Sequence, residues 1–458
     1  MSYKERYKHL LNALACFVMW AVQVAAFAYV WYQIYVPGIA VEDRFWDRGN
    51  WAVVGMYGLI LFFFTQVFGG YRIGYNRITE MVLSNFIAVI CSNVVEYFQL
   101  CMILNDYVPV QPLALLLVAE LIFILPYVYM VRRIYVQMYP PRKMLVVYGD
   151  YSPENFISKI NTRKDKYDVC GTVSYTIGYE KLFKMIHRYQ GVIIVDVPAQ
   201  IRNDIMKYCY QESIRTYVAP KISDVILRGA EDIHMFDTPL LLSRNQGLMI
   251  TQRFWKRTMD IVLSLIGLAI VAPFMIITAV IIKLTDGGPV FYTQERLTRD
   301  GKVFKILKFR SMRSDSEDQS GARLAMKDDD RVTPIGKFIR RIHFDEIPQI
   351  LNILKGDMSI VGPRPERQEI QEQYTESIPE FPLRLKVKAG LTGYAQVYGR
   401  YNTTPYDKVK MDIAYIENYS LWMDIRLIMM TLKVLFQKEN SEGVDSNQTT
   451  AMKVEEEK

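Results

Sequence analysis

Four apolar stretches occupy the first 140 residues and constrain the fold more than any other feature. They are Leu11–Tyr35, Trp51–Gly69, Met81–Leu104 and Pro112–Val131. An α-helix rises about 1.5 Å per residue, so each stretch can cross a hydrocarbon core of roughly 30 Å. The first is too long for a cleavable signal peptide, and no small-residue cleavage site follows it. Residues 1–140 are therefore predicted to form a four-helix transmembrane domain.

Charged residues around these stretches predict the orientation. Basic residues lie before the first stretch, between the second and third, and after the fourth: Lys4, Arg6, Lys8, Arg72, Arg77, Arg132, Arg133, Arg142 and Lys143. The other two loops carry the acidic residues Glu42, Asp43, Asp47 and Asp106, with only Arg44 and Arg48 opposing them. The positive-inside rule then predicts that both termini are cytoplasmic. For Glu96 and Glu120, inside the third and fourth stretches, a structural or assembly role is favoured over a functional one.

The overall charge points to an anionic partner. A net charge of +7 suits a phospholipid surface, a nucleotide or a polyprenyl phosphate. It is too small to indicate nucleic acid, and no RNA-binding signature accompanies the basic residues. The five cysteines form no C-x-x-C pair, which implies no disulfide framework and suits a reducing cytoplasm.

From residue 141 onward the pattern changes to short strands that alternate with helices. Strand-like runs at Met144–Tyr148, Val192–Val197 and Arg215–Val218 predict a Rossmann-like α/β module over residues 141–250. A dinucleotide fold needs G-x-G-x-x-G after its first strand. This chain has Gly149-Asp150-Tyr151-Ser152-Pro153 there. The module is therefore interpreted as degenerate, with a regulatory or structural role, and nucleotide binding by another geometry stays open.

Residues 251–438 place basic side chains around an acidic pair, and residues 439–458 are predicted to be a disordered tail. The basic residues of this cluster are Lys308, Arg310, Arg340, Arg341 and Arg364. Arginine can bind phosphate oxygens with two hydrogen bonds, and carboxylates can hold a divalent metal. Because Asp345 and Glu346 are adjacent, they diverge on a helix and cannot flank one glycosidic bond. One carboxylate can instead attack phosphorus while its neighbour orients it or helps to hold metal.

Five motifs in this region occur in a specific order. They are Gly288-Pro289-Val290-Phe291, Lys308-Phe309-Arg310-Ser311-Met312, Asp345-Glu346-Ile347-Pro348-Gln349, Lys355-Gly356-Asp357-Met358-Ser359 with Val361-Gly362-Pro363-Arg364-Pro365, and Gly390-Leu391-Thr392-Gly393 with Gln396-Val397-Tyr398-Gly399-Arg400. Through these motifs the chain resembles the bacterial sugar transferase family of monotopic phosphoglycosyl transferases. With its upstream spans and α/β module it resembles the large undecaprenyl-phosphate glucose or galactose phosphotransferase subgroup.

The resemblance implies a ping-pong reaction. Asp345 would attack the β-phosphate of a UDP-sugar and release UMP, and the phosphosugar would pass to undecaprenyl phosphate. Glu346 would assist, and both carboxylates would bind Mg²⁺. The basic motif positions Lys308, Arg310, Arg341 and Arg364 would bind phosphate, while Asp330 and Asp424 match further acidic positions whose roles stay open.

The resemblance also implies a setting for this reaction. The catalytic domain would lie on the cytoplasmic face of the bacterial inner membrane, with membrane lipid as a further partner. Glucose or galactose is favoured by the subgroup, and an N-acetylated sugar stays open. Homodimerisation and the pathway served (capsule, exopolysaccharide or O-antigen) are also open.

The apolar run Met259–Lys283 contains Ala272-Pro273, and proline kinks a helix. A full crossing would place the following domain outside, away from cytoplasmic UDP-sugars. We therefore predict a re-entrant helix over residues 259–283, kinked at Pro273, with an ordinary fifth span as the alternative. The family often has Ser-Pro at this kink and Lys-Pro-Gly where this chain has Lys388-Ala389-Gly390, which affects local geometry only.

Two other functional classes compete with the enzyme. A membrane scaffold that has lost turnover is disfavoured by the intact Asp345, Glu346, Lys308 and Arg364. A nucleotide-sugar epimerase or dehydratase based on the α/β module is disfavoured by the missing glycines.

Overall fold

The computed structural model describes residues 7–38, 46–149, 153–243, 247–312, 332–400 and 403–435. Asp330 and the predicted tail at 439–458 lie outside these ranges. The chain divides into two compact units, Met1–Ala219 and Pro220–Lys458. The prediction of apolar N-terminal helices followed by an α/β region is confirmed.

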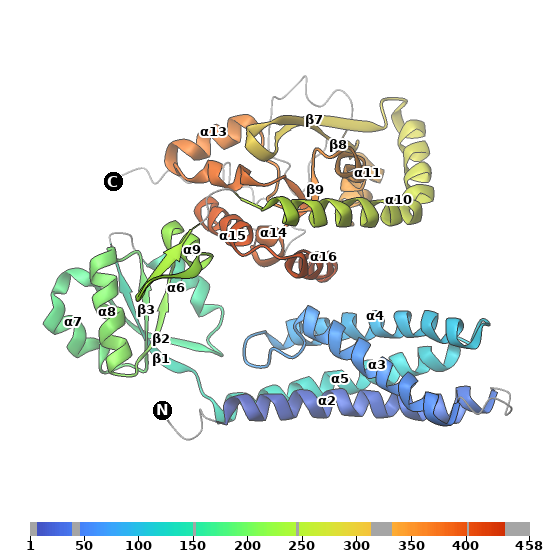
Figure 1. Cartoon of the computed structure of the whole chain (residues 1–458), viewed down its shortest axis with the longest axis horizontal. Helices are drawn as coiled ribbons and strands as arrows, with labels where there is room; N and C mark the ends of the chain where they lie inside the picture. The colour runs from blue at the N-terminus through green and yellow to red at the C-terminus, as the bar shows by residue number, and fades with distance from the viewer. Residues whose placement is uncertain are drawn as a thin grey trace. The chain divides into compact units, whose positions relative to one another are not determined.

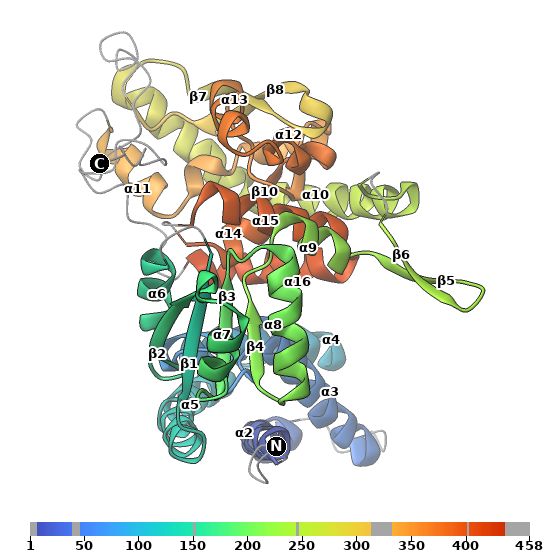
Figure 2. The ribbon, with the colours of Figure 1, turned by 90° about the vertical axis from the view of Figure 1, so that its left-hand side faces the viewer.

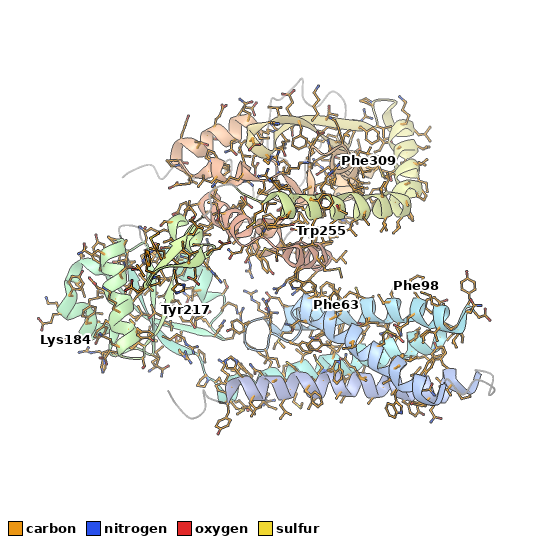
Figure 3. The ribbon with its side chains drawn as sticks, viewed as in Figure 1. Phe63, Phe98, Lys184, Tyr217, Trp255 and Phe309 are labelled. Atoms are coloured by element: carbon orange, nitrogen blue, oxygen red, sulfur yellow. The ribbon has the colours of Figure 1, made fainter. Side chains whose placement is uncertain are left out.

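Long apolar helices form the first part of unit 1 (Figure 1). They are α2 (Lys8–Val30), continued by η1 (Trp31–Tyr35) and η2 (Val36–Gly38), then α3 (Trp46–Phe68), α4 (Ile78–Leu104) and α5 (Gln111–Met138). All four long helices are long and apolar enough to cross a membrane. Rings such as Phe63 and Phe98, labelled in Figure 3, are exposed on the bundle surface, while the rings of Phe27 and Tyr57 stack 4.1 Å apart inside it.

Glu96 and Glu120, the two carboxylates predicted inside the apolar stretches, are both buried. Glu120 accepts hydrogen bonds from the Tyr57 hydroxyl (2.5 Å) and the Asn93 amide (2.9 Å), which join α3, α4 and α5. Glu96 lies on the same buried face of α4 as Asn93. The contacts of Glu120 are those of the structural role favoured from the sequence, because they satisfy a buried polar group within the bundle.

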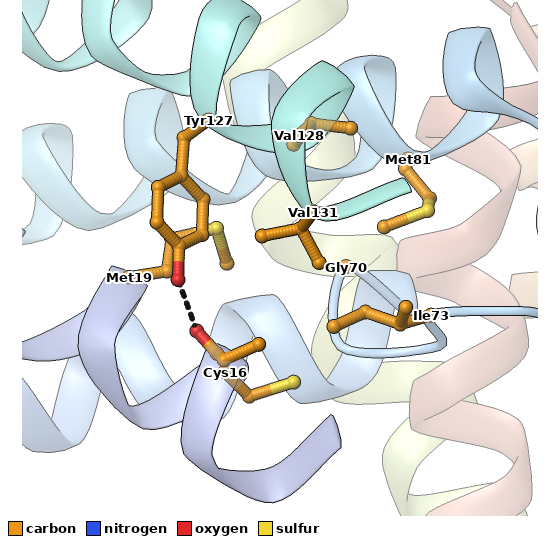
Figure 4. A pocket seen from close by; sticks show the side chains of 9 residues that line it. Cys16, Met19, Gly70, Ile73, Met81, Tyr127, Val128 and Val131 are labelled. Atoms are coloured by element: carbon orange, nitrogen blue, oxygen red, sulfur yellow. Dashed lines mark hydrogen bonds between the residues drawn. The ribbon is translucent and has the colours of Figure 1, made fainter. Parts of the chain in front are cut away.

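A small cavity lies between α2, α4, α5 and the turn after α3 (Figure 4). Its lining is mainly apolar: Ala15, Cys16, Met19, Gly70, Ile73, Met81, Tyr127, Val128 and Val131. The Tyr127 hydroxyl donates to the Ala15 carbonyl oxygen at 2.7 Å, the bond drawn as a dashed line. An apolar lining whose tyrosine is already satisfied is typical of packing between helices rather than of a ligand site.

A parallel four-stranded sheet in the order β2-β1-β3-β4 completes unit 1. Its elements are β1 (Arg142–Tyr148), α6 (Glu154–Asn161), β2 (Tyr167–Ser174), η3 (Tyr175–Ile177), α7 (Tyr179–Ile186), β3 (Gly191–Val195), α8 (Ala199–Gln211) and β4 (Arg215–Val218). Leu145 and Val147 pack toward α7 and α8, whereas Met144 and Val146 pack toward α6. Helices therefore cover both faces, which explains why Met144–Val147 of β1 and Val192–Val195 of β3 are apolar.

Gly149 has a packing role rather than that of a fingerprint glycine. A Cβ at this position would collide with the carbonyl oxygen of Asp196, which follows β3. Glycine thus allows the ends of β1 and β3 to approach each other closely.

Unit 2 contains the remaining elements: α9 (Ile222–Arg228), β5 (Glu231–Met235), β6 (Thr238–Leu242), α10 (Ile250–Asp286), β7 (Phe291–Leu297), η4 (Arg299–Gly301), β8 (Val303–Phe309), α11 (Pro334–Arg341), η5 (Phe344–Glu346), α12 (Gln349–Lys355), β9 (Ser359–Val361), α13 (Gln368–Ser377), η6 (Phe381–Lys386), β10 (Gly390–Thr392), α14 (Tyr394–Tyr398), α15 (Pro405–Glu417) and α16 (Leu421–Leu435). The unit begins ahead of the predicted domain start at 251, because Ile222 and Val225 of α9 pack against Phe381 and Val409. Strands β5 and β6 form an antiparallel hairpin that extends away from the other elements of this unit (Figure 2).

Helix α10 bends into two arms, as Figure 1 shows, and contains Pro273. Arg257, on the first arm, donates to the carbonyl oxygens of Ile353 and Leu354 at the end of α12. Ile282, on the second arm, packs against Phe309 of β8. Both arms therefore contact the same compact unit, while most other apolar side chains of α10, including Trp255 (Figure 3), are exposed.

Candidate active site

The acidic pair lies in the short helix η5, directly after a reversal of the chain. His343 adopts a left-handed conformation (φ 54°) between α11 and η5, a conformation that few residues other than glycine adopt. The ring of Phe344 then stacks on Phe309, with the ring centres 6.1 Å apart and the planes 3° from parallel. This packing fixes η5 against β8, and Asp345 is left only 8% exposed.

A side-chain amide holds α12 against the same strand. The Asn352 amide nitrogen donates to the Lys305 carbonyl oxygen (2.8 Å), and its oxygen accepts from the Leu307 backbone nitrogen (2.9 Å). The amide thus bonds the edge of β8 as a neighbouring strand would. With both η5 and α12 attached to β8, Lys308 at the end of the strand faces Glu346.

Two cations bind Glu346. Lys308 Nζ lies 2.7 Å from Glu346 Oε1, and an Arg364 guanidinium nitrogen lies 3.2 Å from the same oxygen. Burial alone would raise the pKa of the Glu346 carboxyl, but Arg364 and Lys308 lower it to about 2. Glu346 is therefore a fixed negative charge at neutral pH.

Asp345 has the opposite electrostatic environment. Burial raises the pKa of its carboxyl above the ordinary value, and the charge of Glu346 adds to the rise. Electrostatic interactions with Lys308, Arg340 and His343 oppose this shift without cancelling it. No described residue donates a hydrogen bond to the Asp345 carboxylate, so its oxygens are available to react. A buried carboxylate of raised pKa beside fixed cations is suited to nucleophilic attack on a phosphate.

Close backbone contacts position the loop that carries Arg364. A Cβ on Gly362 would collide with the Lys388 carbonyl oxygen, so glycine is required where the chain after β9 approaches the residues just before β10. The guanidinium of Arg384 donates to the Arg364 carbonyl oxygen (3.0 Å) and to the Asp412 carboxylate (2.9 Å). This buried ion pair therefore holds the loop that carries Arg364 in place.

The structure brings together some of the sequence-predicted residues and separates others. Lys308 and Arg364 both reach the acidic pair, as described above. Arg341 is exposed and makes no hydrogen bond or ion pair with any described residue, whereas its neighbour Arg340 acts on Asp345. Arg310 is buried against Gly288, just after β8. The periodicity of a helix could not show which of Arg340 and Arg341 faces the acidic pair, because α11 ends at Arg341.

Other predicted residues lie elsewhere. Pro273 is inside α10. Asp424 is paired with Lys256 at 2.6 Å, and Asp330 is outside the described residues. Sequence reasoning missed Arg384 and its partner Asp412, because the two are far apart in the sequence and belong to none of the five motifs.

The acidic pair can take part in a metal site only together with a ligand. Among the described residues, no group of three or more His, Cys, Asp or Glu side chains could hold a metal ion. Mg²⁺, however, commonly uses one or two carboxylates and completes its shell with phosphate oxygens and water. Asp345 and Glu346 fit that arrangement when a pyrophosphate is bound beside them.

Comparison with known proteins places these observations in a family. Residues 251–438 match the family described as bacterial sugar transferase. The chain is 34% identical over 310 residues to a UDP-N-acetylgalactosamine-undecaprenyl-phosphate N-acetylgalactosaminephosphotransferase of Aeromonas hydrophila, covering 64% of this chain and 67% of that protein. It is 34% identical over 258 residues to a UDP-glucose:undecaprenyl-phosphate glucose-1-phosphate transferase of Klebsiella pneumoniae, covering 55% of this chain and 54% of that protein.

A third relative has a shorter matching region. A UDP-glucose:undecaprenyl-phosphate glucose-1-phosphate transferase of Caulobacter vibrioides is 38% identical over 191 residues, which are 41% of this chain and 71% of that protein. For several other relatives the match spans about half of their length. The names of these relatives differ in the sugar that they specify.

Proposed function

The chain belongs to the bacterial sugar transferase family, and from that premise we propose that it transfers a sugar 1-phosphate from a UDP-sugar to undecaprenyl phosphate, releasing UMP. The observation that carries the proposal is the acidic pair, in which a buried Asp345 carries no hydrogen bond from a described residue while Glu346 is held by Lys308 and Arg364. The reaction would initiate assembly of a polysaccharide or glycoconjugate.

In the proposed mechanism Asp345 is the nucleophile of two displacements. Its carboxylate oxygen attacks the β-phosphorus of the UDP-sugar, the bond from that phosphorus to the bridging oxygen breaks, and the oxygen leaves on UMP. An oxygen of undecaprenyl phosphate then attacks the same phosphorus, and the electron pair returns to the Asp345 carboxylate. Lys308 and Arg364 stabilise phosphate charge and keep Glu346 ionised beside the nucleophile.

Asp345 and Glu346 are also the proposed ligands of Mg²⁺. When bound, the ion would reduce the repulsion between these carboxylates and the pyrophosphate. Because Glu346 Oε1 already accepts from Lys308 and Arg364, its second oxygen and those of Asp345 are the available donors.

The identity of the released nucleotide tests the proposed function. Membranes containing the protein, given a UDP-sugar, Mg²⁺ and polyprenyl phosphate, should release UMP. Activity should disappear on chelation and return with added Mg²⁺. A panel of UDP-glucose, UDP-galactose and UDP-N-acetylgalactosamine would identify the sugar, with glucose and galactose the first candidates. Release of UDP would instead indicate an ordinary glycosyltransferase, and no turnover with any sugar would favour a scaffold.

The pH dependence of the reaction should report the ionisation of Asp345. The carboxylate must be ionised to attack, so kcat/KM should fall at acid pH, with an apparent pKa above that of an ordinary aspartate. Glu346 does not titrate in this range because its pKa is about 2. Lys308→Gln removes a charge that lowers the pKa of Asp345, so it should move the acid limb to higher pH. Superimposable profiles of the two enzymes would contradict this assignment.

We further propose that α10 enters and leaves the membrane on one face, as a re-entrant helix, with the catalytic domain on the cytoplasmic side of the bacterial inner membrane. The contacts of both arms with one compact unit support this. From residue 257 to residue 282 a straight helix would extend about 37 Å, long enough to cross a membrane. In a cysteine-free background, Ile250→Cys and Thr285→Cys should both react with an impermeant maleimide from the cytoplasmic side. Reaction from opposite sides would establish a fifth span.

The parallel sheet of unit 1 is proposed to be a degenerate Rossmann-like module with a structural or regulatory role. Its first loop lacks the glycine fingerprint, and Gly149 serves strand packing. Titration of the protein with NAD should therefore show no binding, whereas saturable binding would overturn this role.

A further inference from the structure

A set of positively charged side chains extends from Arg364 toward α15. We call it the cationic cluster: Arg296, Arg364, Arg367, Arg384 and Lys408. The carboxylates that act on it are fewer: Asp345, Glu346, Glu366 and Asp412. The charges of Arg364 and Arg384 act on Lys408, and that of Arg364 also acts on Glu346. Arg364 therefore links the cationic cluster to the acidic pair.

Three arginines of the cluster are bound to protein groups. Arg384 bonds to Asp412 and to the Arg364 backbone. Arg364 bonds to Glu346 at 3.2 Å, and Arg296 donates to the Gln294 side chain at 2.7 Å and to the Pro365 carbonyl oxygen at 3.5 Å. These contacts give each of the three a role in holding the loop around Arg364.

Lys408 differs from them. It lies one helical turn before Asp412 on α15, but Asp412 is already bound by Arg384. Lys408 donates no hydrogen bond and forms no ion pair with any described residue. Its side chain is half-buried. The amine of Lys408 is not among the fully buried polar atoms, so it still reaches solvent and can donate a hydrogen bond to a ligand.

The electrostatic setting of Lys408 agrees with a surplus of positive charge. Burial lowers the pKa of its amine; Glu366 and Asp412 counter this, but Arg384 and Arg364 lower it further. A phosphate group bound at Lys408 would raise the pKa of the amine again, because it adds negative charge.

We propose that Lys408 is a substrate-binding residue that donates a hydrogen bond to a phosphate oxygen, next to the phosphate bound at Arg364 and Asp345. This inference rests on the proposed function, in which two phosphates of a UDP-sugar, or one of the polyprenyl acceptor, must lie near the acidic pair. The shared chemistry is a phosphate oxyanion, and its source is either the nucleotide or the lipid. The contact is present before and during transfer, so it serves binding more than the chemical step.

The test compares Lys408→Gln with Lys410→Gln. Lys410 lies on the same helix, but it is paired with Asp407 (2.8 Å) and lies over the Tyr406 ring. Lys408→Gln should raise KM roughly ten- to hundredfold for the substrate whose phosphate it binds, with kcat changed by less than about threefold. Lys408→Arg should restore KM, because it keeps the charge, and Lys410→Gln should change neither parameter.

The two KM values identify the source of the phosphate. An increase for the UDP-sugar assigns Lys408 to the nucleotide, and an increase for polyprenyl phosphate assigns it to the acceptor. If the KM values for both substrates are unchanged in Lys408→Gln, the inference is overturned. The proposed function still stands in that case, provided that the wild-type enzyme releases UMP. Absence of UMP release by the wild type would instead contradict the proposed function.

A second measurement needs no variant. Trace acetylation of wild-type protein, read by mass spectrometry, should show Lys408 protected by UMP or by a short-chain polyprenyl phosphate, while Lys410 reacts equally in all samples. Lack of protection by either ligand would overturn the inference, even if the Lys408→Gln protein did not fold.

Discussion

Asp345→Asn should lower turnover by roughly 10³-fold or more, because the amide cannot form the covalent bond to phosphorus on which both displacements depend. The substitution keeps the size and shape of the side chain. Burial disfavours the ionised form of Asp345, so the neutral amide should leave the midpoint of thermal unfolding unchanged or slightly higher. UMP release and thermal unfolding of the purified variant together measure both effects.

A matched control is Asp300→Asn, in the turn between β7 and β8. Asp300 is left-handed (φ 60°), a conformation that asparagine tolerates as well as aspartate does, and its exposed side chain is paired with Arg299. This variant should retain activity within about twofold, as expected for a surface substitution. An Asp345→Asn enzyme that kept more than a tenth of wild-type turnover would exclude Asp345 as the nucleophile.

Lys256→Met should lower the free energy of unfolding of the catalytic unit by about 3–5 kcal/mol, since it leaves a buried carboxylate without its cation. The Lys256 and Asp424 side chains are 7% and 0% exposed, and their charged atoms are 2.6 Å apart. The Tyr415 hydroxyl donates to the second oxygen of Asp424 at 2.8 Å, which does not replace the lost positive charge. Denaturant unfolding of the detergent-solubilised protein measures the loss.

Two further variants distinguish the cost of breaking the buried ion pair from the general cost of losing a lysine. The Lys355 side chain is 74% exposed and paired with Asp357 at 3.1 Å, so Lys355→Met should cost less than about 1 kcal/mol. Combining Lys256→Met with Asp424→Leu removes both buried charges and should recover much of the stability. Equal losses for Lys256→Met and Lys355→Met would show that the buried pair has no special role.

This ion pair also shows what the sequence could not reveal. Lys256 and Asp424 are 168 residues apart, and neither belongs to a contiguous motif. Asp424 matched an acidic position of the family, but its role stayed open because pattern alone does not identify a partner. The structure gives that role: Asp424 joins α16 to the first arm of α10.

Features with strong local patterns were predictable. The long apolar runs and strands β1, β3 and β4 were expected close to where they occur. Strand β2 was missed, because its side chains alternate between half-buried and exposed at the sheet edge rather than forming an apolar run. Within the site, the motifs identified Lys308 and Arg364, which both reach Glu346.

The remaining site residues depend on how the chain folds over longer distances. Whether Arg340 or Arg341 faces the acidic pair is decided by the last turn of α11 and the left-handed His343. Arg310 turns to Gly288 although it alternates with Lys308 in the sequence, because β8 ends at Phe309 between them. Lys408 could be identified as a candidate only after Arg384 was seen to occupy Asp412.

The most direct test of the central claim is to trap the phosphosugar on the protein. Wild-type enzyme incubated with UDP-sugar and Mg²⁺, without lipid acceptor, should be quenched and digested for mass spectrometry. The peptide containing Asp345 should carry a sugar phosphate, and the modification should disappear when polyprenyl phosphate is added. If transfer to the lipid proceeds while this peptide remains unmodified at every time point, a covalent intermediate at Asp345 is contradicted.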